Sequence, residues 1–376
     1  MDFNYFLPVN LHFGRGVHQI IGSEAKKLGK KALIVTGGNS TKKSGLLEKT
    51  EFLLSKNNVE YVLFDKVTPN PLVSMIYEGS KLASGNNCDL VIALGGGSSI
   101  DAAKAIAFQT LNGGDINDYI YGRKSIKKAL PLIAVPTTCG TGSEGNGYAV
   151  LTNDITKDKK SLCGDVLIPK CSIVDPSLMM TMPKSVLVSV GFDALCHNIE
   201  AFISKAAQPI SNSFALEGVK LAVEGLNILI EGSDVVKGWD CLSLASSLGG
   251  MAIYVSSVTA IHGMEHPVSG LKNIAHGKGL AALAPYIYEK SLDAVPQKFL
   301  QLSKILGGND ESDFLDKLKE FLSKLGLSET LGDMGVTEDD LDWLTENCLK
   351  VSAKTMANHP VVFTAEDIKE IYQKAL

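Results

Sequence analysis

The chain has few cysteines, no long apolar run and no cluster of charge of one sign. Its seven cysteines are scattered over 376 residues without a C-x-x-C pair, which argues against a disulfide framework and favours reduced thiols. The net charge is −5 and no basic block occurs, so we expect neither nucleic acid nor an anionic membrane as a partner. The N-terminus shows no secretion signal, and no stretch reaches about 18 apolar residues. The sequence therefore predicts a cytoplasmic protein without a membrane span.

The length and the pattern of apolar residues predict two domains. In the first half, continuous apolar runs alternate with amphipathic stretches, which indicates parallel strands covered by helices on both faces. The expected strands are 32–36, 61–64, 90–94, 132–136 and 172–175. The expected helices of the second half are 185–205, 210–231, 239–262, 278–291, 295–306, 310–325, 337–352 and 365–376. The pattern thus predicts an α/β domain with a parallel sheet over 1–180 and an all-helical domain over 181–376, with a ligand cleft between them.

Four of the seven histidines gather with a carboxylate in two short segments of the second half. Asp193 and His197 are four residues apart, so on a helix they share one face. Their neighbours are apolar, and a buried carboxylate is costly unless a positive group meets it. His262, His266 and His276 stand near glycines, where backbone segments can approach closely. One Asp with three His suits Fe²⁺ or Zn²⁺, whereas an Asp/His pair on its own is more often structural.

A glycine-rich loop follows one expected strand and opens a helix. Gly95, Gly96 and Gly97 allow backbone N–H groups to approach an anion, and the start of the helix adds unpaired donors and the positive end of its dipole. Ser98 or Ser99 is the expected N-cap. The loop matches neither the G-x-G-x-x-G nor the Walker pattern. A plain tight turn is therefore the alternative interpretation.

A second polar loop, 136–144, follows the next expected strand. Its dense hydroxyl groups are suited to a phosphate or to the amide of a nicotinamide ring, and an exposed Ser/Thr loop is the alternative. Because ligands bind at the carboxyl ends of parallel strands, two such loops at successive strand ends favour a dinucleotide.

These motifs, in this order and spacing, resemble the iron-containing (group III) alcohol dehydrogenase family, in particular its branch of butanol dehydrogenases and aldehyde reductases. The resemblance covers nearly the whole chain and is carried by the two loops and by the segments 191–200 and 262–277. It implies a dehydroquinate-synthase-like fold, with an α/β dinucleotide-binding domain over 1–180 and an all-helical metal-binding domain over 181–376, and a homodimer. It also implies a bound Fe²⁺ or Zn²⁺, with His266 beside the metal as a catalytic residue. The metal ligands that it implies are Asp193, His197, His262 and His276.

The same resemblance implies a site for a nicotinamide dinucleotide. The glycine loop would hold the pyrophosphate, the second loop and Lys160 would contact the ribose and nicotinamide, and Asn70 would close the adenine side. The expected cofactor-binding residues are Gly37, Gly38, Ser40, Asn70, Gly95, Gly96, Gly97, Ser98, Asp101, Thr137, Thr138, Thr141 and Lys160.

The end of the first expected strand bears on the choice of cofactor. In NAD-preferring members of such folds, an acidic residue near this point binds the 2′-hydroxyl of the ribose. Here no acid occurs before Glu48, and Lys42 and Lys43 are available to meet a 2′-phosphate. The sequence predicts a preference for NADP(H), with NAD possible. A solvated helix face is the alternative reading of the two lysines.

The resemblance implies a metal-dependent, NAD(P)-linked alcohol dehydrogenase or aldehyde reductase for small molecules, namely short- to medium-chain primary alcohols or aldehydes. The metal would polarise the substrate oxygen while hydride moves to or from the nicotinamide. His266 would relay a proton or hydrogen-bond the substrate, unless it is structural. Glu200 would orient a metal ligand or form an exposed ion pair.

Three alternatives remain open at this point. One is a glycerol or polyol dehydrogenase of the same fold. Another is a lyase resembling dehydroquinate synthase, which would need several basic residues where only Lys272 and Lys278 stand near the histidines. The third is a metal-binding protein without catalytic activity.

Overall fold

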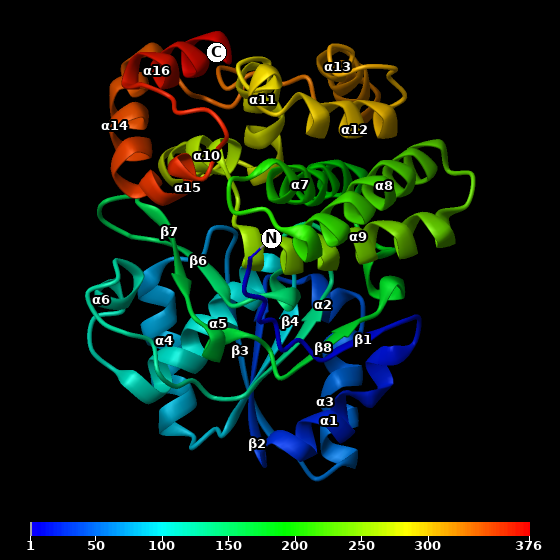
Figure 1. The fold of residues 1–376 in the computed structure, drawn as a ribbon. Helices are drawn as coiled ribbons and strands as arrows, with labels where there is room; N and C mark the ends of the chain where they lie inside the picture. The colour runs from blue at the N-terminus through cyan, green and yellow to red at the C-terminus, as the bar shows by residue number, and fades with distance from the viewer. Residues whose placement is uncertain (1) are drawn as a thin grey trace.

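A computed structural model describes residues 2–376 of the chain (Figure 1). Its main sheet has six parallel strands in the order β1-β8-β5-β4-β2-β3. The strands are β1 (Leu11–Phe13), β2 (Lys31–Gly37), β3 (Glu60–Val67), β4 (Leu90–Gly95), β5 (Leu132–Pro136) and β8 (Cys171–Val174). All five expected strands are present. The short edge strand β1 was not predicted, because its three residues form no apolar run.

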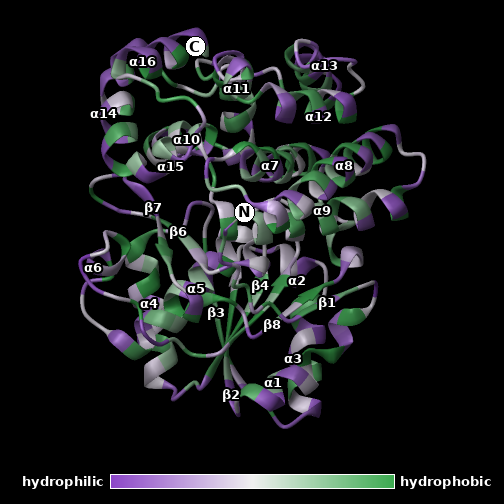
Figure 2. Cartoon of the chain, viewed as in Figure 1, coloured by the Kyte–Doolittle hydropathy of each residue, from purple (hydrophilic) through white to green (hydrophobic). Residues whose placement is uncertain are grey.

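Helices cover both faces of this sheet, as the apolar runs predict. α1 (Ile21–Leu28) and α3 (Leu46–Lys56) pack with Ile34 and other strand residues on one face. α4 (Val73–Gly85) and α5 (Gly97–Asn112) pack with Leu33 and its equivalents on the other. Successive strand residues therefore enter different cores, as the alternation of side chains along a strand requires. Figure 2 shows the hydrophobic residues concentrated along the strands and the inward sides of these helices.

A separate antiparallel hairpin, β6 (Tyr148–Thr152) and β7 (Lys159–Cys163), leaves the α/β domain and contacts α10 of the helical domain. The sequence did not predict it, because β7 carries two lysines and a serine in five residues. The shorter elements are α2 (Ser40–Lys43), α6 (Asn117–Ile120), η1 (Val17–Ile20), η2 (Ser143–Gly145), η3 (Asp165–Leu167), η4 (Pro176–Met179), η5 (Leu292–Ala294) and η6 (Glu338–Asp340).

From α7 onwards the described chain is helical (Figure 1). Its helices are α7 (Lys184–Ile203), α8 (Pro209–Glu231), α9 (Val235–Ser256), α10 (Ala260–Lys272), α11 (His276–Glu289), α12 (Pro296–Leu306), α13 (Phe314–Leu325), α14 (Leu341–Val351), α15 (Ala353–Ala357) and α16 (Ala365–Lys374). Within residues 2–376, α7 is the one helix long and apolar enough to span a membrane, and α9 with α10 would pass the same test if counted as one bent span. However, 89% of the apolar window of α7 is buried in the structure, where the helix packs against α8, α9 and α11. Burial in the protein core accounts for its composition.

The expected single helix 239–262 is wrong, because the chain bends by 106° between α9 and α10. Ser257 adopts a positive φ of 60° at the break. The backbone N–H and the hydroxyl of Thr259 then donate hydrogen bonds to the carboxylate of Glu200 on α7, each at 2.8 Å. This contact fixes the start of α10 on α7 and places His262 in its first turn.

Candidate metal and cofactor site

A cavity of about 830 Å³ lies between the two domains. The first turns of α5 after the glycine loop, the second polar loop and the β6–β7 hairpin line it from the α/β side. Helices α7, α9 and α10 and the start of α11 line it from the helical side. Predicted site residues on its wall are Asn70, Ser98, Asp101, Thr141, Lys160, His197, His262, His266 and His276.

Asp193 lies at the centre of the histidines. Its Oδ1 is 3.4 Å from Nε2 of His262, 3.4 Å from Nδ1 of His197 and 3.8 Å from Nε2 of His276. Asp193, His262 and His276 each offer one ligand atom within 4.8 Å of the others. His197 lies outside this group of three, with its ring stacked on His262 at 4.4 Å and its Nδ1 facing the carbonyl of Gly140 at 3.2 Å. The structure thus brings together all four predicted ligands, which we call the Asp193 cluster.

Two buried glutamates contact the outer nitrogens of these histidines. Glu200 contacts Nδ1 of His262, and Glu265 contacts Nδ1 of His276. With Nδ1 engaged in this way, Nε2 of each ring is directed to the centre of the cluster, as in carboxylate–histidine–metal arrangements. The alternative that Glu200 forms an exposed ion pair is wrong, because its side chain is fully buried. Glu265 was not predicted.

The cluster holds an excess of buried negative charge. Asp193, Glu200 and Glu265 are all buried, and the buried ammonium of Lys159 lies 3.9 Å from Glu265. Burial alone would lower the pKa of His262, but Glu200 and Asp193 raise it to about 10. With all the imidazoles neutral, as metal ligation requires, three carboxylates and one ammonium leave a net charge of about −2, which a divalent cation would neutralise in place of a proton on His262. The mixed oxygen and nitrogen donors fit Fe²⁺ or Zn²⁺.

His266 faces the same cavity. Its ring centroid is 5.9 Å from that of His262 and 5.5 Å from that of His276. Burial, and secondarily the charge of Lys159, holds its pKa well below the ordinary value. The ring is therefore neutral near pH 7 and is suited to exchange a hydrogen bond with a substrate rather than to rest as an imidazolium.

The two polar loops pack against each other at adjacent strand ends, as predicted. Gly95 is in register with the last residue of β5. An added Cβ at Gly97 would lie 2.3 Å from Thr141, and one at Gly96 would lie 3.0 Å from Thr138. These two positions leave no room for a side chain, so the loops form a close pair of backbone segments.

The start of α5 is open to an anion. The helix begins at Gly97 with Gly96 as its N-cap, and no side chain caps it. Its first backbone N–H groups therefore remain available, together with the positive end of the helix dipole. The expected capping by Ser98 or Ser99 is wrong, because both residues lie inside the helix.

Asp101, one of the expected cofactor-binding residues, has both carboxylate oxygens hydrogen-bonded to groups of the protein. Its oxygens accept hydrogen bonds from the hydroxyl of Ser143 at 2.6 Å and from the backbone N–H of Val150 at 3.0 Å. One turn along α5, the buried ammonium of Lys104 donates to the loop that contains Ser143. Asp101 therefore positions the second loop and the hairpin rather than offering free oxygens to a dinucleotide.

Two residues expected to bind the cofactor, Asn70 and Lys160, instead form hydrogen bonds between the two domains. Asn70 Nδ2 donates to Asn273 Oδ1 at 2.9 Å, and Lys160 Nζ donates to the carbonyl of Val351 at 2.6 Å. The neighbouring Lys159 is the lysine that points toward the histidines, because adjacent strand residues face opposite sides. This orientation could not be predicted, since β7 itself was not predicted.

The adenine end of the expected site lies where β2 ends. An added Cβ at Gly37 would lie 2.6 Å from the carbonyl oxygen of Val67, so an acidic side chain does not fit there. Lys42 is paired with Asp65 of β3, an acid that is distant in sequence. Of the two lysines expected near the ribose, only Lys43 has no ion-pair partner among residues 2–376. The turn and helix that follow β2 contain the remaining expected residues, Gly38 and Ser40.

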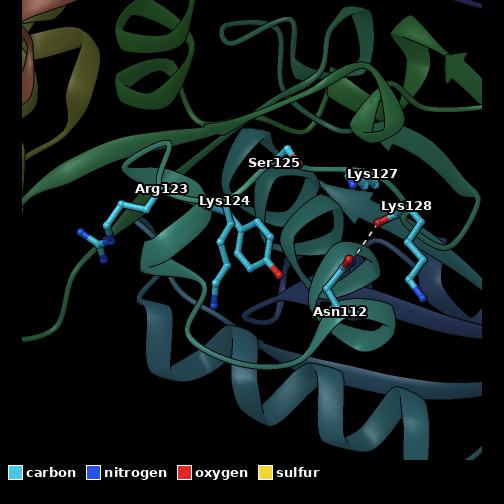
Figure 3. Close-up of a pocket in the computed structure, with 7 residues that line it drawn as sticks. Asn112, Arg123, Lys124, Ser125, Lys127 and Lys128 are labelled. Atoms are coloured by element: carbon cyan, nitrogen blue, oxygen red, sulfur yellow. Dashed lines mark hydrogen bonds between the residues drawn. The ribbon is translucent and has the colours of Figure 1, made fainter.

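A second hollow lies on the loop after α5 (Figure 3). It is lined by four cations, Arg123, Lys124, Lys127 and Lys128. Arg123 and Lys124 are paired with Asp118. The hollow begins at Asn112, the last residue of α5, about 24 Å along that helix from the glycine loop. It is therefore separate from the candidate site.

Family models match the two domains of the chain separately. A family model described as iron-containing alcohol dehydrogenase matches residues 8–176, and one described as the C-terminal part of that family matches residues 187–376. The NAD-dependent methanol dehydrogenase of Bacillus methanolicus is 32% identical and covers 99% of this chain and 100% of its own. An archaeal alcohol dehydrogenase from a Red Sea brine pool aligns with a TM-score of 0.95 at 32% identity, over 100% of this chain and 99% of its own. The NADH-dependent butanol dehydrogenase A of Thermotoga maritima aligns with a TM-score of 0.91 at 33% identity, over 100% and 98%.

These matches extend over both domains, and the Asp193 cluster of the helical domain carries oxygen and nitrogen donors suited to an iron ion. An alcohol or aldehyde oxidoreductase activity with a nicotinamide cofactor follows from the family. The chain belongs to the iron-containing alcohol dehydrogenase family.

Proposed function

We propose that the protein is an NADP(H)-preferring aldehyde reductase or alcohol dehydrogenase for short- to medium-chain primary substrates, with the Asp193 cluster as its metal site. One observation carries this proposal: His262 and His276 face the same cavity as Ser98, at the start of α5, and Thr141 of the second polar loop. The residues that would hold the metal and those that would hold the nicotinamide dinucleotide therefore line one cavity. Val150 and Ile253 on the cavity wall offer apolar contacts to an alkyl chain.

The residues around the cavity have different roles in the proposed reaction. The bound ion supplies a Lewis acid for the substrate oxygen. Glu200 and Glu265 hold two of the imidazoles in a fixed orientation, and the open N-terminus of α5 anchors the pyrophosphate. His266 exchanges a hydrogen bond with the substrate oxygen as a neutral imidazole. Burial of Asp193, His197 and His262 keeps bulk water from the atoms that would hold the metal, and the nicotinamide would supply or accept the hydride.

The preference for NADP(H) is proposed from the adenine end of the site. No acid occupies the end of β2, Gly37 admits no side chain, and Lys43 has no ion-pair partner within the described residues 2–376. Two of the similar proteins carry NAD or NADH in their names, so the ratio of kcat/KM for NADPH and NADH decides the point. Lys43→Ala should lower the efficiency with NADPH and leave that with NADH unchanged. Equal efficiencies of the unaltered protein with the two cofactors would refute the preference.

Metal content and turnover test the site directly. Protein purified without oxygen should contain about one Fe²⁺ or Zn²⁺ per chain and should oxidise NADPH with butanal and related aldehydes. His276→Ala should lose the metal and nearly all turnover, whereas His12→Ala, at the edge of the sheet, should keep both. Full activity after exhaustive chelation would exclude the proposed chemistry.

The alternatives predict different substrates. A glycerol or polyol dehydrogenase would oxidise glycerol, which this protein should not turn over. A dehydroquinate-synthase-like lyase needs free basic residues for a phosphorylated acid, but Lys272 is paired with Asp340 and Lys278 with Glu329. Turnover of aldehydes without phosphate release would separate the proposal from both.

Two further expectations stand as proposals. A homodimer is supported by exposed Phe3, Phe6 and Phe13 on and before the edge strand β1, and a measurement of mass in solution tests it. A cytoplasmic location is supported by seven free cysteines, and fractionation of cells that express the protein tests it.

A further inference from the structure

Lys159 is a buried lysine to which the proposed chemistry gives no role. It begins β7 and its side chain is only 6% exposed. Its Nζ donates a hydrogen bond to the hydroxyl of Ser269 at 2.7 Å and lies 3.9 Å from Oε2 of Glu265. An ammonium group taken out of water costs several kcal/mol unless it is paired. The position of Lys159 therefore depends on these two partners on α10.

Glu265 connects Lys159 to the metal site. Its Oε2 accepts a hydrogen bond from Ser269 at 3.1 Å and contacts Nδ1 of His276. An added Cβ at Gly279 would lie 2.8 Å from Oε1 of the same carboxylate, so α11 confines Glu265 from the other side. A continuous polar path thus runs from Lys159 through Ser269 and Glu265 to His276.

This path crosses the boundary between the domains. The β6–β7 hairpin is part of the α/β domain, whereas α10 and α11 belong to the helical domain. The hairpin lies directly on α10 at Gly270, where an added Cβ would be 2.4 Å from the carbonyl oxygen of Lys157. The same hairpin lines the cavity through Val150 and Ser161. Any displacement of the hairpin therefore moves Lys159 relative to Glu265.

We propose that Lys159 is a positioning residue that, through Ser269 and Glu265, holds His276 toward the metal and couples the seating of the hairpin on α10 to metal affinity. The proposal rests on the metal site proposed above. It separates two adjacent lysines: Lys160 ties the hairpin to the carbonyl of Val351, whereas Lys159 acts on the metal ligand.

The test compares Lys159→Met and Ser269→Ala with Lys81→Met, which makes the same lysine change at an exposed position of α4. The affinity for Zn²⁺ is measured by competition with a chelator, with and without saturating NADPH. The visible spectrum of the Co²⁺-loaded proteins reports the ligand geometry. Urea unfolding of each metal-free protein reports its stability separately. Ser269→Ala removes only a hydroxyl, so it keeps the test decisive if Lys159→Met does not fold.

We expect both site variants to bind Zn²⁺ about 10-fold more weakly than Lys81→Met, with an altered Co²⁺ spectrum, since orienting partners of metal ligands contribute factors of this size. We also expect NADPH to change the Zn²⁺ affinity of the unaltered protein by a larger factor than that of Lys159→Met. Zn²⁺ affinities within twofold of Lys81→Met and an unchanged Co²⁺ spectrum would overturn the role of Lys159. Failure of the unaltered protein to bind the metal would instead remove the proposed function itself.

Discussion

Replacement of Glu200 by glutamine is a sharp test of the metal site, because it changes one hydrogen-bonding atom without changing the shape of the side chain. One carboxylate oxygen accepts two hydrogen bonds from Thr259, and a glutamine carbonyl would keep both. The other oxygen faces Nδ1 of His262, and there glutamine presents an NH₂ donor. His262 must then offer the lone pair of Nδ1, so its proton moves to Nε2, the nitrogen that faces Asp193 at 3.4 Å.

The structure sets the size of the effect. A proton on Nε2 removes that nitrogen as a metal ligand, and forcing the other tautomer costs the hydrogen bond to the amide. Loss of such an orienting partner lowers metal affinity about 10- to 100-fold, or about 1.4–2.7 kcal/mol of binding free energy. Because both contacts to Thr259 survive, the junction of α9 and α10 should remain intact.

The assay is competition for Zn²⁺ between the protein and a chromogenic chelator, together with kcat for an aldehyde at saturating NADPH and metal. Glu217→Gln is the control, since it makes the same change at an exposed position of α8, where Glu217 is paired with Lys220. If Glu200→Gln had the same Zn²⁺ affinity and the same kcat as the control, Glu200 would not set the tautomer of His262.

Three other perturbations test the surrounding structure. In Gly250→Ala the added Cβ would lie 1.9 Å from the carbonyl oxygen of Gly142, so urea unfolding should show a loss of about 1–3 kcal/mol and NADPH should bind more weakly. Lys104→Met should also lower the free energy of unfolding and the affinity for NADPH, because its buried ammonium lies within hydrogen-bond distance of four acceptors on Ser143, Asn146 and Tyr148. Burial lowers the pKa of His18 and of His359 to about 4. Between about pH 6.5, the unfolded pKa, and about pH 4, these two histidines are protonated in the unfolded chain but neutral in the folded chain. The free energy of unfolding therefore decreases as the pH is lowered through this window, by up to about 1.4 kcal/mol per pH unit for each group. His359→Gln should reduce that slope in urea titrations between pH 7 and 5, and an unchanged slope would contradict the assignment.

The elements that the sequence predicted correctly are those set by local pattern. Asp193 and His197 share a helix face because of their spacing alone, and the two polar loops adjoin because parallel strands end at the same edge. The five strands with continuous apolar runs were visible for the same reason. The hairpin strand β7 was not visible, because its residues are polar and their pairing with β6 is decided between segments.

The donors of the site could therefore be named from the chain alone, but not the groups that orient them. Whether Lys159 or Lys160 faces the histidines depends on strand pairing. The place where α9 ends and α10 begins depends on Glu200, 59 residues away in sequence from Thr259. Likewise, the pairing of Lys42 with Asp65 alters the charge expected at the adenine end. Spacing along the backbone determines which residues share a helix or a loop. Only tertiary packing decides which buried charges face one another, because their pairing is enforced by the exclusion of water from contacts between distant segments.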